Sequence, residues 1–166
     1  MLSNNTSVNN LIEKLAERLQ EKKLMLAVAE SCTGGLLAQQ CTELCGSSSW
    51  FECGFVTYSN ASKIRLLDVQ VDVLNENGAV SSQVADQMAE GVLSHSDADI
   101  SASITGIAGP SGGSDTKPVG TVYISTAVKN QSAGATHHIF QGNRQSIREQ
   151  SMQMAITKLI SKLEHI

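Results

Sequence analysis

A serine and a cysteine lie side by side in a glycine-rich stretch, Ala29-Glu30-Ser31-Cys32-Thr33-Gly34-Gly35. Ser31 and Cys32 are both side chains that can act as nucleophiles. The stretch follows the apolar run 24–28 and precedes apolar residues at helical spacing, which predicts a turn between a strand and a helix. Ligands collect at such carboxyl ends of strands, and N–H groups at a helix start favour an anion. Two glycines would let a ligand approach the backbone closely.

The same turn also has a purely structural interpretation. Ser31 or Thr33 would cap the following helix, which is the commonest role of Ser and Thr just before helices. The turn by itself leaves the capping role and the functional role open.

A nucleophilic serine needs a base, and the histidines are poor candidates for it. His137 and His138 are adjacent on a predicted strand, so their side chains point to opposite faces. His95 and His165 have no partner in sequence. Lysine can act as a base when burial or a cationic neighbour lowers its pKa. Lys63 follows a predicted strand end and is the natural candidate, although a lysine is more often a solvated surface residue.

Standard metal and phosphate motifs are missing. The four cysteines show no C-x-x-C spacing and no histidine partner, so we expect reduced cytoplasmic thiols and no zinc site. Neither G-x-x-x-x-G-K-[ST] nor G-x-G-x-x-G occurs, and Ser31 is preceded by Ala29-Glu30 and therefore does not lie in a G-x-S-x-G motif. The stretch 114–117 matches S-x-x-K, but it lies in a Gly/Pro loop without a K-T-G tripeptide, and we interpret the match as chance.

The length, composition and net charge are those of an ordinary globular chain. It has 166 residues, 41% of them hydrophobic and 17% charged, which predicts one soluble domain over residues 1–166. No apolar run approaches a membrane span, and the polar start is no signal peptide. A net charge of −4 argues against a general nucleic-acid binder but permits a small anionic ligand. We expect a cytoplasmic homo-oligomer.

Periodicity supplies the elements that would position these residues. Helices are predicted over 8–21 and 33–45, shortly after Ser59, after Ser81, and in a long final segment capped by Asn143. Strands are predicted over 24–29, 53–58, 99–105, 119–128 and 135–141, the last two as an antiparallel pair. Helices that alternate with strands, followed by a late hairpin, predict an α/β fold with a mixed sheet covered on both faces.

Several motifs occur in a fixed order along the chain. They are the stretch 29–35, Tyr58-Ser59-Asn60 with Lys63, Gly78-Ala79-Val80-Ser81, Thr105-Gly106-Ile107-Ala108-Gly109-Pro110, Gly112-Gly113-Ser114 and Lys117-Pro118-Val119-Gly120-Thr121-Val122. Together they closely resemble the CinA C-terminal-domain family of nicotinamide-nucleotide amidohydrolases, from about residue 8 to 160. The resemblance implies a three-layer α/β/α sandwich. It also implies hydrolysis of the carboxamide of nicotinamide mononucleotide to nicotinate mononucleotide and ammonia, without a metal or cofactor.

The resemblance further implies that Ser31 is the nucleophile, with Lys63 and Tyr58 as its catalytic partners. The family often has a charged residue inside Tyr-Ser-Asn-x-x-Lys, where this chain has Ala61-Ser62; that difference affects the local electrostatics and leaves Lys63 in place.

Substrate binding is expected from the residues around these three. Backbone N–H groups after Ser31, in the segment Cys32, Thr33, Gly34 and Gly35, would hold the oxyanion. The glycine loop that begins with Gly106, together with Arg144, would hold the 5′-phosphate; the alternative for Arg144 is an exposed helix residue with no binding role. Thr105 would either bond the substrate or simply end its strand.

Two other functions remain open at this point. The chain could be a nucleotide-binding regulatory domain that keeps the fold without turnover, or it could hydrolyse a different amide. The combination of Ser31, Tyr58 and Lys63 favours an enzyme, because a pure binding domain needs no lysine beside a serine.

Overall fold

A mixed five-stranded sheet forms the centre of the molecule, with strand order β2-β1-β3-β4-β5. The computed structural model describes the backbone of residues 2–166 and the side chains of residues 8–166. The strands are β1 (Leu26–Glu30), β2 (Phe51–Val56), β3 (Ile100–Gly106), β4 (Thr121–Val128) and β5 (Gly134–Ile139). The helices are α1 (Leu2–Lys22), α2 (Leu36–Thr42), α3 (Asn60–Leu67), α4 (Val71–Asn77), α5 (Ser82–Ser94) and α6 (Arg144–Leu163).

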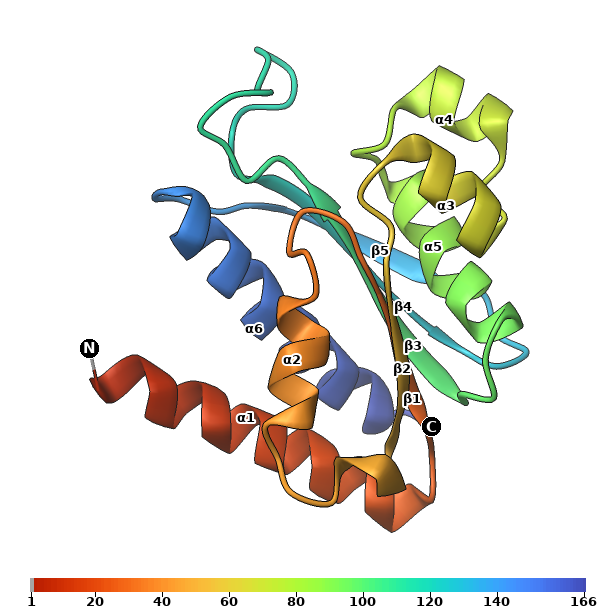
Figure 1. The fold of residues 1–166 in the computed structure, drawn as a ribbon, viewed down its shortest axis with the longest axis vertical. Helices are drawn as coiled ribbons and strands as arrows, with labels where there is room; N and C mark the ends of the chain where they lie inside the picture. Colours follow the sequence, from red (N-terminus) through yellow and green to blue (C-terminus); the bar gives the residue numbers. More distant parts are fainter. Residues whose placement is uncertain (1) are drawn as a thin grey trace.

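Helices cover both faces of this sheet, which confirms the predicted three-layer α/β/α sandwich. β1 pairs in parallel with β2 and β3, whereas β3–β4 and β4–β5 are antiparallel. In Figure 1, α1, α2 and α6 lie on one side of the sheet and α3, α4 and α5 on the other. Because β1, β2 and β3 run in the same direction, their carboxyl ends meet at one edge, drawn at the top of Figure 1.

The central strand β1 is buried on both faces, as is typical of a strand between helical layers. Successive side chains alternate between the two cores because a strand has a period of two. Leu26 and Val28 pack in the core under α1, α2 and α6, while Ala27 and Ala29 pack in the core under α3, α4 and α5. The Ser31 turn follows directly after this doubly buried strand.

Two predicted element boundaries were wrong near the site. The helix expected over 33–45 is shorter, because Gly34 (φ 61°) and Gly35 (φ 95°) adopt left-handed backbone conformations that delay its start to Leu36. The strand expected over 53–58 covers Phe51–Val56, so Tyr58 lies beyond it. The prediction also missed α4, a seven-residue helix in which only Leu74 is buried.

Other local predictions were correct. Ser81 caps α5 by accepting a hydrogen bond from Val84 N–H (3.3 Å), and Asn143 caps α6 by accepting one from Ser146 N–H (2.9 Å). β4 and β5 form the expected antiparallel pair. The first helix covers the predicted range 8–21, but its predicted start was wrong, because α1 begins at Leu2.

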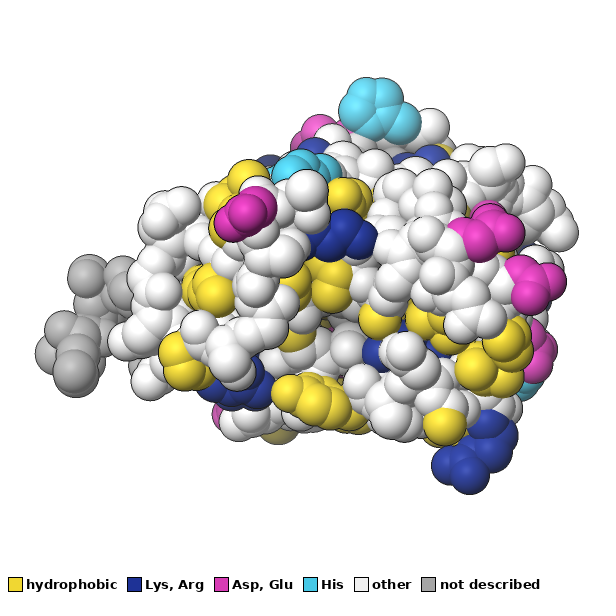
Figure 2. Space-filling view, turned by 90° about the horizontal axis from the view of Figure 1, so that it is seen from above, with side chains coloured by type: hydrophobic (Ala, Val, Ile, Leu, Met, Phe, Trp, Pro, Cys, Tyr) yellow, Lys and Arg dark blue, Asp and Glu magenta, His cyan; other side chains and the backbone are white. Residues whose placement is uncertain are grey.

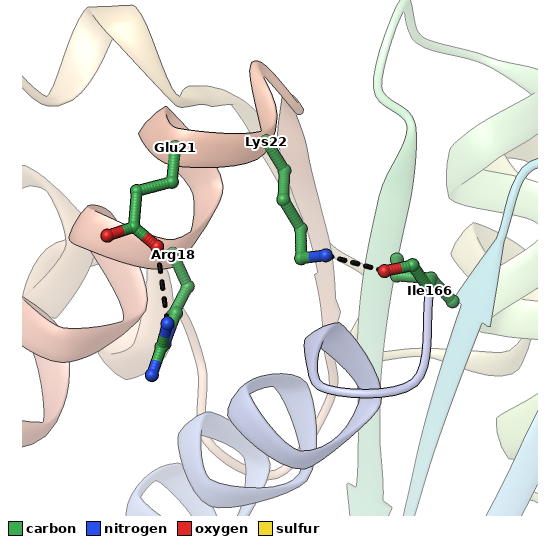
Figure 3. A network of polar contacts seen from close by, with 4 residues as sticks. All are labelled: Arg18, Glu21, Lys22 and Ile166. Carbon is green, nitrogen blue, oxygen red and sulfur yellow. Dashed lines mark hydrogen bonds and ion pairs between the residues drawn. The ribbon is translucent and has the colours of Figure 1, made fainter.

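The end of α1 lies beside the C-terminus of the chain, at the edge opposite the strand ends. Lys22 Nζ donates a hydrogen bond to the carbonyl of Ile166, and Arg18 pairs with Glu21 across one helical turn at 3.2 Å (Figure 3). Within the described residues, no helix is long and apolar enough to cross a membrane.

Candidate active site

Lys63 reaches across from α3 to Ser31 at the end of β1. Its Nζ lies 3.0 Å from Ser31 Oγ, and it donates hydrogen bonds to the backbone carbonyls of Thr57 (2.7 Å) and Tyr58 (3.3 Å). Lys63 is 1% exposed and Ser31 is 8% exposed. The fold therefore brings a candidate nucleophile and a candidate base into direct contact.

Local backbone structure explains why Lys63 points at Ser31. Thr57 N–H donates to the Glu30 carbonyl (2.8 Å), which joins the ends of β2 and β1. Ser59 then caps α3 by accepting a hydrogen bond from Ser62 N–H (3.1 Å). Lys63 follows in the first turn of that helix, so its side chain extends back over the ends of the two strands.

Burial changes the protonation of Lys63. Desolvation lowers the pKa of its amine from 10.5 to about 8, against a smaller opposing effect of the Cys32 thiol. Backbone carbonyls and a hydroxyl surround the nitrogen, and among the described residues no carboxylate pairs with it. With a pKa of about 8, roughly a tenth of Lys63 is neutral at pH 7, and this neutral form is able to accept the Ser31 proton.

The Ser31 turn itself is tightly bonded. Ser31 N–H donates to the Ile104 carbonyl of β3 (2.9 Å), and Gly34 N–H donates to the Ser31 carbonyl (3.1 Å). From α6, Arg148 Nη2 donates to the Thr33 carbonyl (2.6 Å). The turn is therefore held by hydrogen bonds to two other elements as well as within itself.

Capping of α2 is carried out by Glu30, and the interpretation that Ser31 or Thr33 caps this helix is wrong. The Glu30 carboxylate accepts hydrogen bonds from Gly35 N–H (3.1 Å), Leu37 N–H (3.1 Å) and Ala38 N–H (2.8 Å). The left-handed turn through Gly34 and Gly35 turns the helix start toward Glu30, away from the two hydroxyls. The N–H groups expected to attract an anion at this helix start are thus already occupied.

Cys32, the rival nucleophile, packs in the apolar core under α1, α2 and α6. Burial raises the pKa of its thiol from 9.0 to about 11, and the Glu30 carboxylate adds to that rise. Because the thiolate is the reactive form, this environment keeps Cys32 inert. All four cysteines are free thiols.

Tyr58 lies at the rim of the site with its side chain 62% exposed. Its hydroxyl accepts a hydrogen bond from Arg144 Nη2 (3.1 Å), and Arg144 Nη1 donates to the Gly109 carbonyl (2.8 Å). The backbone carbonyl of Tyr58, and not its phenol, is the group that contacts Lys63 in the described residues. Arg144 therefore joins the β2–α3 connection to the second glycine-rich loop.

The remaining predicted binding residues lie around the same edge of the sheet. Thr105 is buried, and its hydroxyl donates to the Ala79 carbonyl (2.8 Å), which ties the end of β3 to the segment before α5. Gly106 is the last residue of β3, opposite Val122. Thr33 is fully buried, and within residues 8–166 its hydroxyl has no hydrogen-bond partner.

A pocket of about 390 Å³ lies where the starts of α2 and α6 meet, and Arg144 and Arg148 line it together with Leu36, Gln145 and Glu149. Figure 2 views the molecule from the edge where β1, β2 and β3 end, and basic side chains are visible near the middle of this face. Among the described residues, no group of three or more His, Cys, Asp or Glu side chains could hold a metal ion.

Sequence reasoning missed Glu30 and Arg148, although both left a signal. Glu30 is a single charge at the end of an otherwise apolar strand, which is where a buried carboxylate with a dedicated partner is expected. Arg148 follows Arg144 by four residues, so the two share one helix face.

Comparison with known proteins agrees with this geometry. The CinA C-terminal domain model matches residues 8–163, and the chain belongs to this family. It is 45% identical to nicotinamide-nucleotide amidohydrolase PncC of Enterobacter agglomerans, over 92% of this chain and 96% of that protein. It is also 50% identical to a putative competence-damage inducible protein of Caldicellulosiruptor bescii, over 87% of this chain but only 35% of that longer protein.

Solved structures show the same fold. The competence/damage inducible protein CihA of Agrobacterium tumefaciens superposes with a TM-score of 0.91 at 40% identity, with 95% of each chain covered. A CinA-superfamily protein of Klebsiella pneumoniae gives a TM-score of 0.92 at 32% identity, over 96% of this chain and 99% of that one.

Proposed function

We propose that this protein hydrolyses the carboxamide of nicotinamide mononucleotide to nicotinate mononucleotide and ammonia, as a step in pyridine nucleotide recycling. The observation that carries the proposal is the buried Lys63 amine 3.0 Å from Ser31 Oγ. The substrate comes from relatives named nicotinamide-nucleotide amidohydrolase, at 45% and 42% identity over nearly their whole lengths.

The reaction begins with proton transfer from Ser31 to neutral Lys63. Ser31 Oγ attacks the carboxamide carbon, and the carbonyl oxygen becomes an oxyanion held by backbone N–H groups of the turn. The protonated Lys63 returns its proton to the leaving nitrogen, and ammonia departs. Lys63 then deprotonates a water, which attacks the acyl ester; the ester C–O bond breaks, Lys63 returns the proton to Ser31 Oγ, and the acid product loses its proton to solvent as the carboxylate. No step requires a metal or a cofactor.

Residues at the rim of the site would bind the nucleotide portion of the substrate. Arg144 offers a charge beside Tyr58 and Gly109, and it is our candidate for the 5′-phosphate together with the glycine loop. Tyr58 stays a predicted catalytic partner. Its hydroxyl would have to leave Arg144 to relay a proton between Ser31 and Lys63, and substrate phosphate bound to Arg144 supplies a reason for it to do so.

Ammonia release from a panel of amides tests this function. Nicotinamide mononucleotide, nicotinamide riboside, nicotinamide and NAD are compared with the wild-type protein and the Ser31→Ala variant. We expect the wild type to release ammonia fastest from nicotinamide mononucleotide, and the Ser31→Ala variant to release none. Faster release from another amide would reassign the substrate and keep the chemistry, whereas binding without any release would support the regulatory-domain alternative.

We also infer a cytoplasmic homo-oligomer. Four free thiols suit a reducing compartment. The two edge strands carry exposed apolar side chains, Val56 on β2 and Ile139 on β5, that a second copy would cover. Light scattering on the purified protein measures the oligomeric state, and a monomeric mass would reject this inference.

A further inference from the structure

Glu30 is a buried carboxylate that the mechanism above does not use. It is 1% exposed, and its partners are the N–H groups of Gly35, Leu37 and Ala38, at 2.8–3.1 Å. An ionised carboxylate is costly to bury unless hydrogen bonds compensate it, and three backbone donors do so here. Among the described residues, neither ion pair of the structure involves Glu30.

These bonds decide which N–H groups of the turn stay free. Glu30 occupies those of Gly35, Leu37 and Ala38, while Gly34 N–H and Leu36 N–H donate to the carbonyls of Ser31 and Thr33. Within the described part of the chain, the N–H groups of Cys32 and Thr33 are the ones in this turn that donate neither to a backbone carbonyl nor to the Glu30 carboxylate. They directly follow Ser31, where the oxyanion of an acyl transfer develops.

A charge of the other sign also holds this turn. The half-buried Arg148 of α6 donates to the Thr33 carbonyl at 2.6 Å. The turn that follows Ser31 is thus bonded both to a carboxylate, which holds N–H groups, and to a guanidinium, which holds a carbonyl. Oxyanion donors are effective when they are fixed before the reaction begins, and this arrangement fixes them.

We propose that Glu30 is a positioning residue for the oxyanion site. By holding the start of α2 against the end of β1, it keeps the N–H groups of Cys32 and Thr33 free and aimed at the tetrahedral intermediate on Ser31. This inference rests on the proposed amide hydrolysis. Glu30 itself would make no contact with the substrate.

Glu30→Gln is the first test. The amide keeps one acceptor oxygen but places an NH2 donor against at least one backbone N–H, so the turn loses its full set of bonds. We expect kcat to fall about 10²-fold, the effect of a small misplacement of reacting groups, while KM changes less than about threefold. The matched control is Glu43→Gln, an exposed carboxylate at the other end of the same helix, and it should leave both constants unchanged.

An oxyanion mimic supplies the readout that separates positioning from mere stability. Pyridine-3-boronic acid adds to a serine oxygen and becomes a negatively charged tetrahedral adduct. In Glu30→Gln its affinity should fall by about the same factor as kcat, because both depend on the same donors. The affinity for the product nicotinate mononucleotide should stay within about threefold, since the product makes no oxyanion.

Arg148→Gln removes the guanidinium that donates from α6 to the Thr33 carbonyl, and so loosens the same turn. This variant keeps the proposal testable if Glu30→Gln fails to fold. It should show the same loss of kcat and of boronate affinity, with product affinity kept. Unchanged kcat and boronate affinity in a folded Glu30→Gln or Arg148→Gln variant would overturn the positioning role. So would an equal loss of boronate and product affinity. A wild-type protein that neither releases ammonia nor binds the boronate would instead refute the proposed function itself.

Discussion

The two glycine-rich turns of this protein follow neighbouring parallel strands, yet they are held in opposite ways. The turn 31–35 after β1 is bonded to Glu30, Ile104 and Arg148, and much of it is buried. The segment after β3 exposes residues 110–116, and among the described residues its side-chain bonds to other elements lie on either side of this exposed tip. There Arg144 donates to the Gly109 carbonyl and Lys117 to the Asn77 carbonyl, at 2.8 and 2.9 Å.

This difference matches the tasks that we assign to the two turns. Making and breaking a covalent bond requires reacting atoms fixed to within fractions of an ångström, and the first turn is built with that rigidity. Holding a nucleotide tail requires a surface that can adapt, and loops with few buried contacts open at low cost. Variants of the first turn should therefore lower kcat, and variants of the second should raise KM.

The largest effect is expected at Ser31. Ser31→Ala should abolish ammonia release, because no other described side chain is placed to form the acyl-enzyme. Cys32→Ala should retain most of the activity, since that thiol is buried and protonated. Steady-state rates of the two variants, with circular dichroism to confirm folding, decide between them. Loss of activity in Cys32→Ala alone would transfer the nucleophile to the thiol.

The second largest effect on activity is expected at Lys63. Lys63→Met should lower kcat by roughly 10²–10⁴-fold, the range for loss of a general base, with KM nearly unchanged. Lys63→Arg should not restore turnover, because a guanidinium stays protonated. Near-normal kcat in Lys63→Arg would show that a fixed positive charge suffices, and the base would then be Tyr58 or a bound water.

At the second turn, Arg144→Gln should raise KM for nicotinamide mononucleotide by about tenfold, as expected for one lost charge-assisted hydrogen bond to phosphate. kcat should stay within about threefold of the wild type. Nicotinamide riboside, which has no phosphate, serves as the internal control and should be turned over equally by both proteins. A drop in kcat with unchanged KM would instead place Arg144 in the catalytic step, through Tyr58.

The smallest effect is expected at Lys117, which ties the loop to the end of α4. Lys117→Met removes the bond to the Asn77 carbonyl and should raise KM about twofold to threefold, because the loop then samples more conformations. Hydrogen exchange of residues 107–120 should become faster, while that of 31–35 stays the same. Equal acceleration in both turns would show that they are mechanically coupled.

The sequence predicted the main parts of this picture, and the reasons for its failures are physical. The apolar runs and the turn residues indicated where β1, β2 and α3 lie, and Lys63 followed as a candidate base; its partnership with Ser31 was what the family resemblance implied. Their 3.0 Å contact comes from the parallel pairing of β1 with β2, which no local pattern specifies. The start of α2 was misplaced because the left-handed conformation of two glycines cannot be distinguished from helix in a sequence.

Glu30 shows a different kind of limit. A glutamate before Ser-Cys-Thr-Gly-Gly can be identified from the sequence, but its three N–H partners depend on how the chain turns back after β1. α4 was missed because a seven-residue helix with one buried side chain produces no periodicity.

The pH dependence of kcat/KM, measured on the wild type and on Lys63→Met side by side, tests the central claim most directly. The Lys63 pKa lies near 8 because burial lowers it, so the amine is protonated and inactive below that pH and becomes a base above it. The wild-type profile should therefore rise with pH through an apparent pKa of about 8 and then level off. The residual activity of Lys63→Met should lack this rise. A wild-type profile that is flat from pH 6 to 10, or one that Lys63→Met leaves unchanged, would contradict Lys63 as the base.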